Sequence, residues 1–319
     1  MAEAVGAACR TSGFFVVVGH GVSEHTISRM YEVCRAFFAQ PAELKDEVRN
    51  DPRDPLQRGF GRYPALEMFC ATRLGEDAPA DTPPDAPGAL EGPNRWPALP
   101  GFREAYWAYY MAVEGLALEL MRLVALALGL PSDWFDDKFD RHMTPLAVNY
   151  YLPRDTPPRP GEVRNDPHTD FGTVTVLYQD DAPGGLQVRD EAGNWLDVPP
   201  IPGSFVINLG RLMTMWTNDR WTSTVHQVVY PPAAQAHLDR ISIAFFHQPN
   251  PDAVVSCIPT CTSADDPPHH RPVTSGEFFL VRSRRAYVRR SLQQNPDRLA
   301  SRSHAAGSSG GSGAGTGAG

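Results

Sequence analysis

The feature that most constrains the fold is a change in hydrophobic period near Pro145. From there the chain consists of short runs rich in Val, Ile, Thr and aromatic residues, separated by turns rich in Pro, Gly and Asp. Runs of this kind predict short β-strands in a compact all-β sandwich or barrel. The expected strands are LAVNYYL, TVTVLYQ, LQV, SFVINLG, HQVVY and RISIAFF.

The first part of the chain shows helical spacing instead. After Ser23, a residue suited to an N-cap, apolar side chains recur every three to four positions, which predicts an amphipathic helix. A second helix is expected from Pro41, and a long helix over residues 102–128, where a Gly-Leu-Pro sequence ends it. Residues 13–21 (GFFVVVGHG) predict a short buried strand closed by a glycine turn.

Three other segments complete the organisation of the chain. Residues 75–100 are dense in Pro, Asp and Gly and predict a long irregular connection. The segment GEFFLVRSRRAYVRRSL predicts a return to helix near the C-terminus. Residues 301–319 are mostly Gly, Ser and Ala, which supply too little apolar surface for a core, so we expect a flexible tail there.

Composition and charge argue against several classes of protein. The net charge of −8 gives no reason to expect nucleic acid or an anionic membrane as a partner. Five scattered cysteines, an odd number, do not resemble the framework of a disulfide-rich secreted protein. No segment has the roughly 18 apolar residues of a membrane span, and the N-terminus lacks the layout of a signal peptide. We therefore expect a soluble cytoplasmic monomer.

An imidazole and a carboxylate stand two positions apart in the segment RNDPHTDFGTVTVLYQD. Residues i and i+2 of a strand share one face, so His168 and Asp170 point to the same place if a strand begins here. His226, at the start of HQVVY, supplies a second imidazole from another expected strand. Two histidines and one carboxylate on barrel strands can form the facial triad of non-haem Fe(II) oxygenases, which leaves three coordination positions open.

Two further polar pairs lie where a plain core would have apolar residues. Asn149 and Tyr151 share one face of the expected strand LAVNYYL, and Arg240 and Ser242 share one face of RISIAFF. On an isolated strand, exposure to solvent would account for Arg and Ser on one face. Because the candidate metal ligands occur in the same β region, the pairs favour a polar site inside the barrel.

Six segments resemble, in their order and approximate spacing, the Fe(II)/2-oxoglutarate-dependent oxygenases of the isopenicillin N synthase-like family. They are NYYLP, HTDFGTVTVLYQD, GGLQV, PGSFVINLG, STVHQVV and RISIAFF. The resemblance covers roughly residues 12–290, and GFFVVVGHGV and GPNRWP look like the family's N-terminal region. In one departure, the chain begins MAEAVGAACR, where family members usually have a short additional strand.

The resemblance implies a fold and a division of the chain. The fold is mainly β, of the α+β type: a double-stranded β-helix (jelly-roll) core with an N-terminal helical region and a C-terminal helix. The N-terminal helical, non-catalytic region covers residues 1–140 and the catalytic jelly-roll core residues 141–256. A C-terminal loop and helix, packed on the core, cover residues 257–300, and the flexible tail covers residues 301–319.

The resemblance also implies roles for the polar residues. The residues that match the family's catalytic iron ligands are His168, Asp170 and His226. Those that match the residues holding the far carboxylate of 2-oxoglutarate are Arg240 and Ser242, and Asn149 and Tyr151 match positions that help to seat it. A guanidinium suits a carboxylate because it is always charged and has a fork of donors. Fe(II), 2-oxoglutarate and O2 are the expected cofactor and co-substrates, with ascorbate as a candidate reductant.

The implied activity is the oxidation of a small organic molecule. Such an enzyme hydroxylates its substrate, or desaturates or cyclises it, and releases succinate and CO2, as in a bacterial tailoring enzyme of secondary metabolism or a catabolic enzyme. By the same resemblance Ala147, Phe246 and Gln248 line a largely apolar substrate cavity. Specificity is expected from residues 58–75 and from the C-terminal helix.

Three alternatives to this function stay open at this point. An oxidase of the isopenicillin N synthase type keeps the same iron ligands and the Arg-x-Ser pair, but needs no 2-oxoglutarate. An ethylene-forming activity that consumes 2-oxoglutarate is another variant. A non-catalytic jelly-roll binding protein would keep the triad only as a structural feature, but it would have no need of Arg240, Ser242, Asn149 and Tyr151.

Other motifs give weaker evidence for a functional site. His20 follows a strand in a turn with no acidic or cysteine neighbour, so we interpret it as structural. Cys257 and Cys261, followed by the adjacent His269 and His270, do not have the spacing of common zinc loops and predict a variable loop. The basic helix RSRRAYVRR is expected to present a solvated face. The chain contains no sequence of the kind that marks nucleotide-binding loops or hydrolase nucleophiles.

Overall fold

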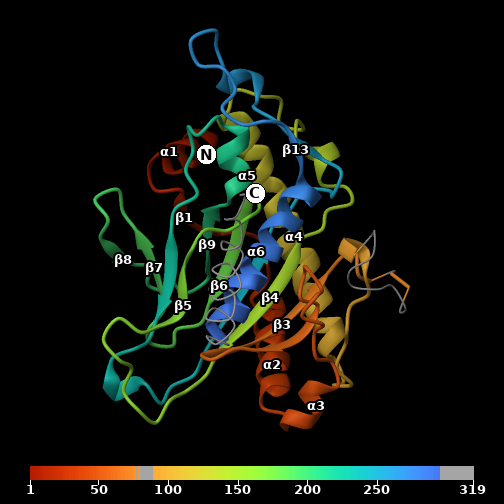
Figure 1. Ribbon diagram of the computed structural model, residues 1–319, viewed down its shortest axis with the longest axis vertical. Coiled ribbons are helices and arrows are strands. Elements are labelled where there is room, and N and C mark those ends of the chain that lie inside the picture. Colours follow the sequence, from red (N-terminus) through yellow and green to blue (C-terminus); the bar gives the residue numbers. More distant parts are fainter. Residues whose placement is uncertain (77, 80–88, 295–319) are drawn as a thin grey trace, which may run out of the picture.

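Two antiparallel β-sheets form the centre of the molecule (Figure 1). The structure, a computed structural model, describes residues 1–76, 78–79 and 89–294. Its strands are β1 (Phe14–Val18), β2 (Gly59–Arg62), β3 (Leu66–Thr72), β4 (Pro145–Tyr151), β5 (Val163–His168), β6 (Val174–Gln179), β7 (Leu186–Arg189), β8 (Trp195–Asp197), β9 (Ser204–Leu209), β10 (His226–Val229), β11 (Arg240–Phe246), β12 (Val254–Val255) and β13 (Val273–Thr274). The larger sheet has the order β1-β9-β6-β11-β4-β3-β2 and the smaller β5-β10-β7-β8, while β12 pairs with β13.

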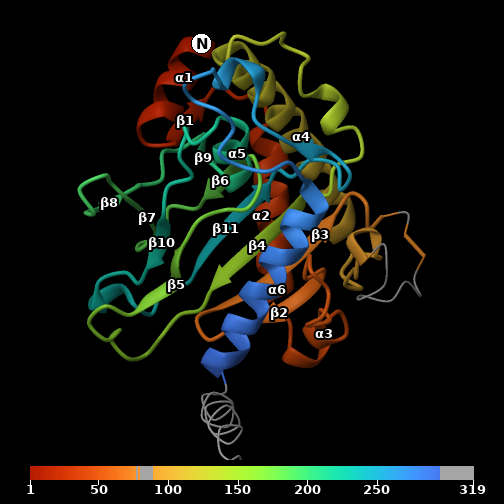
Figure 2. The ribbon, with the colours of Figure 1, turned by 45° about the horizontal axis from the view of Figure 1, so that its top comes forward.

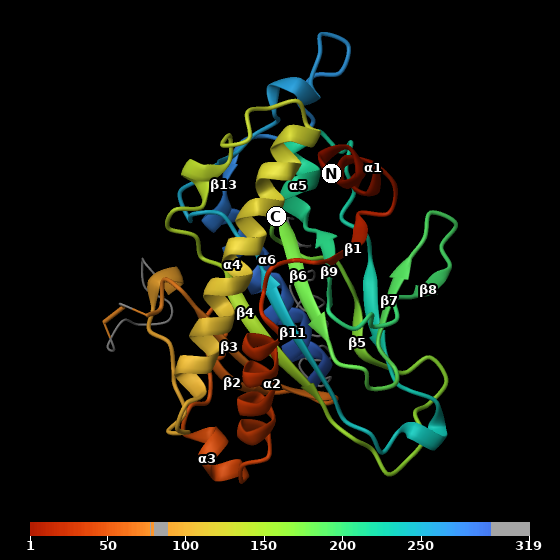
Figure 3. The ribbon, with the colours of Figure 1, turned by 180° about the vertical axis from the view of Figure 1, so that it is seen from behind.

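Helices cover both sides of the larger sheet. They are α1 (Ala2–Thr11), α2 (Glu24–Phe38), α3 (Ala42–Asp46), α4 (Phe102–Ala127), α5 (Arg211–Trp216) and α6 (Ser275–Gln294). The long helix α4 lies behind the sheet in Figure 1 and in front of it in Figure 3, whereas α6 lies on the opposite side. In Figure 2, α6 passes in front of the strands β3 and β4. No helix among the described residues is long and apolar enough to cross a membrane.

The helix after Ser23 shows how the local sequence sets an element boundary. The Ser23 hydroxyl oxygen accepts a hydrogen bond from the backbone N–H of Thr26 at 3.1 Å, so the predicted N-cap is confirmed. The apolar residues at helical spacing are buried against the core; they include Ile27, Met30, Val33, Cys34, Phe37 and Phe38. The long helix and the helix near the C-terminus are likewise found where they were predicted.

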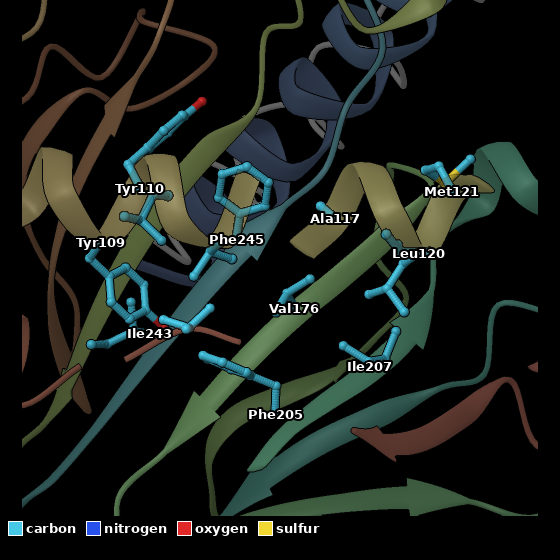
Figure 4. Packing of buried hydrophobic residues seen from close by; sticks show 14 of the residues in the cluster. Tyr109, Tyr110, Ala117, Leu120, Met121, Val176, Phe205, Ile207, Ile243 and Phe245 are labelled. Atoms are coloured by element: carbon cyan, nitrogen blue, oxygen red, sulfur yellow. The ribbon is translucent and has the colours of Figure 1, made fainter. Parts of the chain in front are cut away.

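The core lies between α4 and one face of the larger sheet. Along β11, Ile241, Ile243 and Phe245 point to this face and are fully buried. Figure 4 shows Ile243 and Phe245 packed with Tyr109 and Tyr110 of α4. The alternate residues of β11 point to the opposite face of the sheet, away from α4. The larger sheet therefore has one apolar face against helices and a second face free to carry polar side chains.

Two expectations about the N-terminal part are wrong. Residues 58–75, expected as specificity loops, contain β2 and β3, and β3 pairs along its whole length with β4. Because β3 is buried on nearly every residue, its sequence shows no alternation by which to recognise a strand. The strand β1 is found where predicted but is not fully buried, since it lies at the edge of the larger sheet and Val18 is 66% exposed.

The predicted division at residues 140 and 256 does not follow the sheets. Three strands from residues 1–140, β1, β2 and β3, join the same sheet as the strands from residues 141–256. The division into a non-catalytic region, a catalytic core and a C-terminal segment stays a prediction. The tail predicted for residues 301–319 lies outside the described residues, as do parts of the 75–100 connection and of the region 257–300.

Candidate active site

Two neighbouring side chains, His168 and Asp170, meet a third, His226, from a distant part of the sequence. His168, Asp170 and His226 each present a ligand atom, and these atoms lie within 4.8 Å of one another. The distance from Asp170 Oδ1 is 3.8 Å to His168 Nε2 and 3.6 Å to His226 Nε2. It is the only group of three or more such side chains that could hold a metal ion among the described residues. The structure thus brings together the three ligands proposed from the sequence.

The local geometry differs from the expectation that a strand begins at His168. His168 is instead the last residue of β5, where it pairs directly with His226, the first residue of β10. Asp170 lies in the connection to β6, outside any strand, and its backbone carbonyl accepts a hydrogen bond from the N–H of Arg211 at 2.8 Å. The side chains therefore converge because a loop folds back over a strand pair, and not because residues i and i+2 share a strand face.

Both imidazoles are oriented by backbone carbonyl groups. His168 Nδ1 lies 2.7 Å from the carbonyl oxygen of Asp166, and His226 Nδ1 lies 3.1 Å from that of Thr224. A carbonyl oxygen only accepts hydrogen bonds, so each Nδ1 donates a proton to its carbonyl, and each Nε2 is the nitrogen that faces Asp170. With a cation bound between them, the deprotonated Nε2 atoms would be its ligands.

The carboxylate of Asp170 is held by the larger sheet. Its Oδ2 accepts hydrogen bonds from Thr175 Oγ1 at 2.6 Å and from Asn208 Nδ2 at 2.7 Å. Thr175 on β6 and Asn208 on β9 are register partners, so both side chains reach the same oxygen from one face. Oδ1 is left to face the two imidazoles, which favours ligation of a metal through one oxygen.

The electrostatics of this cluster favour a negative carboxylate. Burial alone would raise the pKa of the Asp170 carboxyl, but the charge and hydrogen bonding of His226, together with His168 and Thr175, lower that pKa well below its usual range. Burial opposes the charged form of His226, and the Asp170 charge outweighs it and raises the pKa of the imidazole. A buried negative charge between two nitrogen donors is a site that attracts a cation.

The four predicted co-substrate residues form a square on the same face of the larger sheet. Strands β4 and β11 are antiparallel neighbours, with Tyr151 opposite Arg240 and Asn149 opposite Ser242. Arg240, Ser242 and Tyr151 are each 2% exposed, and Asn149 is half-buried. Solvent exposure, the simpler interpretation of Arg240 and Ser242 from sequence, is therefore wrong.

The guanidinium of Arg240 has unused hydrogen-bonding capacity. It lies 5.1 Å above the ring of Tyr151, and its Nη2 donates to Gln179 Oε1 at 2.8 Å. Nη1 is buried and has no partner among the described residues. Because a buried guanidinium is seldom left without an anion, this atom indicates where a carboxylate would bind.

Two of the predicted substrate residues, Ala147 and Phe246, lie on the same side of the sheet. Ala147 is opposite Ala244 of β11, and Phe246 is opposite Thr175, which holds Asp170. Phe246 is half-buried and stands outside the hydrophobic clusters of the described residues, which favours a pocket position over a core position. Gln248 is 1% exposed, and its Oε1 has no partner in the described part of the chain.

The other histidine and cysteine motifs do not form a second candidate metal site among the described residues. His20 Nδ1 accepts from the N–H of Val22, and its ring packs on Phe205, which agrees with a structural role. The imidazoles of His269 and His270 bond to aspartates and not to the cysteines; the contacts are with Asp219 and Asp266.

The basic helix is only partly as expected. In the described part of α6, Arg282 is half-buried and its guanidinium lies 5.0 Å above the ring of Phe278. One turn earlier, Phe279 is buried and contacts Phe171, the neighbour of Asp170, with 6.0 Å between the ring centroids. This helix therefore packs onto the loop that carries the candidate carboxylate ligand, and its face is not wholly solvated.

Sequence reasoning missed three residues of the site. Thr175 and Asn208 hold Asp170, and Gln179 accepts from Arg240. Asn208 had a signal, because it is a single amide within the apolar run FVINL of β9. Thr175 and Gln179 had none, since threonine is ordinary in a strand and Gln179 ends its strand.

Comparisons with known proteins give the family. The sequence-family model of the 2OG-Fe(II) oxygenase superfamily matches residues 144–249. A second family model, for the N-terminal region of the non-haem dioxygenase in morphine synthesis, matches residues 1–99. A 2-oxoglutarate-Fe(II) type oxidoreductase of Emericella nidulans is 34% identical over 91% of this chain and 85% of that protein. Validamycin A dioxygenase of Streptomyces hygroscopicus is also 34% identical, over 79% of this chain and 73% of that protein.

Solved structures agree with the sequence relatives. A full-length Neurospora crassa protein, solved in complex with alpha-KG and 5-formyluracil, superposes with a TM-score of 0.79 at 30% identity, covering 88% of this chain and 89% of that one. This similarity confirms the mainly β, jelly-roll fold expected from the sequence. It also favours an enzyme that uses 2-oxoglutarate over the oxidase and the binding protein considered above. The chain thus belongs to the 2OG-Fe(II) oxygenase superfamily and is an Fe(II)- and 2-oxoglutarate-dependent dioxygenase.

Proposed function

We propose that His168, Asp170 and His226 hold the catalytic Fe(II), and that the polar square on β4 and β11 binds 2-oxoglutarate beside it. The observation that carries this proposal is the convergence of three ligand atoms within 4.8 Å of one another. They are two imidazole nitrogens and one carboxylate oxygen. This donor set fits a facial triad, which leaves room for co-substrate and O2. The members of the square are Arg240, Ser242, Asn149 and Tyr151.

The division of labour follows from the contacts. When bound, iron and 2-oxoglutarate supply an oxidative decarboxylation, to succinate and CO2, that provides the oxidising power for the substrate. Arg240 would bind the far carboxylate of 2-oxoglutarate through Nη1, which has no partner among the described residues. Ser242 would supply a hydroxyl from the same face. Thr175 and Asn208 fix the Asp170 carboxylate so that one oxygen faces the metal.

The substrate we propose is a small organic molecule bound beside this site. Ala147 and Phe246 lie on the same side of the sheet, and Gln248 follows two residues after the end of β11. We propose that together they supply an apolar wall with one amide. The contact between Phe279 of α6 and Phe171 places the C-terminal helix next to the iron loop. Because α6 covers that side of the larger sheet, we propose that it borders the substrate pocket (Figure 2).

A direct experiment tests the proposed site in the absence of a known substrate. Purified protein is mixed with Fe(II) and 2-oxoglutarate without O2, and the visible spectrum is recorded. Chelation of the 2-oxo acid to iron should give a weak charge-transfer band, and admission of O2 should then release succinate. A protein that binds neither iron nor 2-oxoglutarate under these conditions would contradict the proposal.

The two residues that hold Asp170 give a graded prediction. Replacing Asn208 with alanine removes one of two hydrogen bonds to Oδ2, and we expect Fe(II) affinity to fall by roughly 10-fold to 100-fold, as for other groups that orient metal ligands. Thr175→Val should have a similar effect. Metal titration followed by tryptophan fluorescence measures it, with Thr11→Val as control, because the exposed Thr11 hydroxyl bonds to the carbonyls of Ala7 and Ala8 within α1. Unchanged affinity in both variants would remove their positioning role.

A further inference from the structure

A second buried arginine lies beside the proposed 2-oxoglutarate pocket. Arg164, on β5, is 3% exposed, and its guanidinium lies 5.9 Å from the ring centroid of Tyr151 and 5.3 Å from that of Tyr230. Its Nη2 donates to the carbonyl of Leu238 at 2.9 Å. Nε and Nη1 are buried and have no partner among the described residues.

Arg164 and Arg240 share the ring of Tyr151. Arg240 lies 5.1 Å from that ring, opposite Tyr151 in the register of β4 and β11. Burial lowers the pKa of the Arg164 guanidinium, and the positive charge of Arg240 lowers it further, so the two charges act on each other. Three guanidinium nitrogens without partners are thus gathered in one buried place, two on Arg164 and one on Arg240.

The carboxylates nearby are already engaged. Asp180 accepts from the N–H of Ile241 at 2.6 Å and from the Tyr31 hydroxyl at 3.2 Å. Asp239 is paired with Arg35 at 3.0 Å and accepts from the Tyr150 hydroxyl at 2.8 Å. Neither forms an ion pair with Arg164 or Arg240 within the described part of the chain. Two buried cations with free donors and no direct counter-ion are costly unless an anion binds between them.

We propose that Arg164 and Arg240 together bind the far carboxylate of 2-oxoglutarate, so that Arg164 is a second co-substrate residue on the strand that also carries His168. This inference rests on the proposed function and extends it. One guanidinium presents two donors to a carboxylate, and a second cation engages its remaining lone pairs. The pocket should therefore select 2-oxo acids that have a second carboxylate.

The test compares the binding of two 2-oxo acids. Wild type, Arg164→Met and Arg240→Met are titrated calorimetrically with 2-oxoglutarate and with 2-oxobutyrate, which chelates a metal in the same way but lacks the far carboxylate; Mn(II) replaces iron and O2 is excluded. Arg164→Met should raise the Kd of 2-oxoglutarate roughly 10-fold to 100-fold, as expected for lost hydrogen bonds to a charged group, and leave that of 2-oxobutyrate unchanged. Arg164→Lys, which keeps the charge without the fork, should give an intermediate loss.

The chain offers a matched control. Arg154 also lies over Tyr230, at 5.0 Å, but it is paired with Glu162 at 2.7 Å and its side chain is 25% exposed. Arg154→Met should bind both acids as wild type does. Equal weakening of both acids in the Arg164 variants would show a structural role and overturn the inference, as would unchanged binding of 2-oxoglutarate. If Arg240→Met also binds 2-oxoglutarate normally, the proposed pocket itself is wrong.

Discussion

Asp170→Ala is expected to abolish Fe(II) binding and, with it, turnover. The variant loses the only carboxylate of the proposed triad, and two imidazoles alone make a weak site for Fe(II). Changes to groups that merely orient metal ligands cost about 10-fold to 100-fold in affinity or activity, so loss of a ligand should exceed about 100-fold. The measurements are the anaerobic charge-transfer band with 2-oxoglutarate and the iron content of the protein after dialysis.

The control for this variant is an exposed aspartate of the smaller sheet. Among the described residues, the Asp197 carboxylate on β8 accepts a hydrogen bond from the Gln187 side chain and contacts no residue of the proposed metal site, so Asp197→Ala should keep the band and the iron. Thermal unfolding of the metal-free proteins shows whether the loss of the Thr175 and Asn208 hydrogen bonds has disturbed the fold. A band of wild-type intensity in Asp170→Ala would remove Asp170 from the metal site.

Arg240→Met should cause the largest loss of co-substrate affinity. The removal of one partner of a buried, hydrogen-bonded charge pair costs about 2–5 kcal/mol. Since about 1.4 kcal/mol corresponds to a factor of ten, the Michaelis constant for 2-oxoglutarate should rise at least about 25-fold. Arg240→Lys should lose about tenfold or more, because an ammonium lacks the planar fork. Succinate release at varied 2-oxoglutarate concentration measures both variants.

The same assay separates the residue's two candidate ligands. Arg189→Met, an exposed arginine on β7, should have the wild-type Michaelis constant for 2-oxoglutarate. If the Arg240 variants instead keep the co-substrate constant and weaken only the binding of the organic substrate, then Arg240 serves the substrate. That outcome would contradict the proposed pocket.

The parts of the fold that sequence predicted are those with a clear periodic signal. In the helix after Ser23, apolar residues recur every three to four positions, and in the strand Arg240–Phe246 they recur at every second position near its start. Each pattern assigns one face of the element to the core. The strand Leu66–Thr72 is buried on both faces and has no such pattern. Such a strand is recognised from the strands that it pairs with in space, and a sequence does not show that pairing.

The site was predictable to the extent that its residues are unusual in combination. Arg240 and the pair His168 and Asp170 are each unremarkable alone, and the sequence indicates them because they occur with His226, Asn149 and Tyr151 in one β region. Thr175 is ordinary in a strand, and its role depends on the fold-back of the loop that carries Asp170. Arg164 follows the same logic, because only the packing of the smaller sheet against Tyr151 shows that it is buried.

The ligands of the proposed metal centre are held by both sheets. His168 and His226 belong to the smaller sheet, whereas the larger sheet holds Asp170 through Thr175 and Asn208. An ion bound by all three residues would connect the two sheets. Iron binding would therefore increase the free energy of unfolding. Iron at a hundred times its Kd would add about 2.7 kcal/mol to the free energy of unfolding. Removal of iron would then lower the thermal stability of the enzyme together with its activity, and both would return when iron is restored.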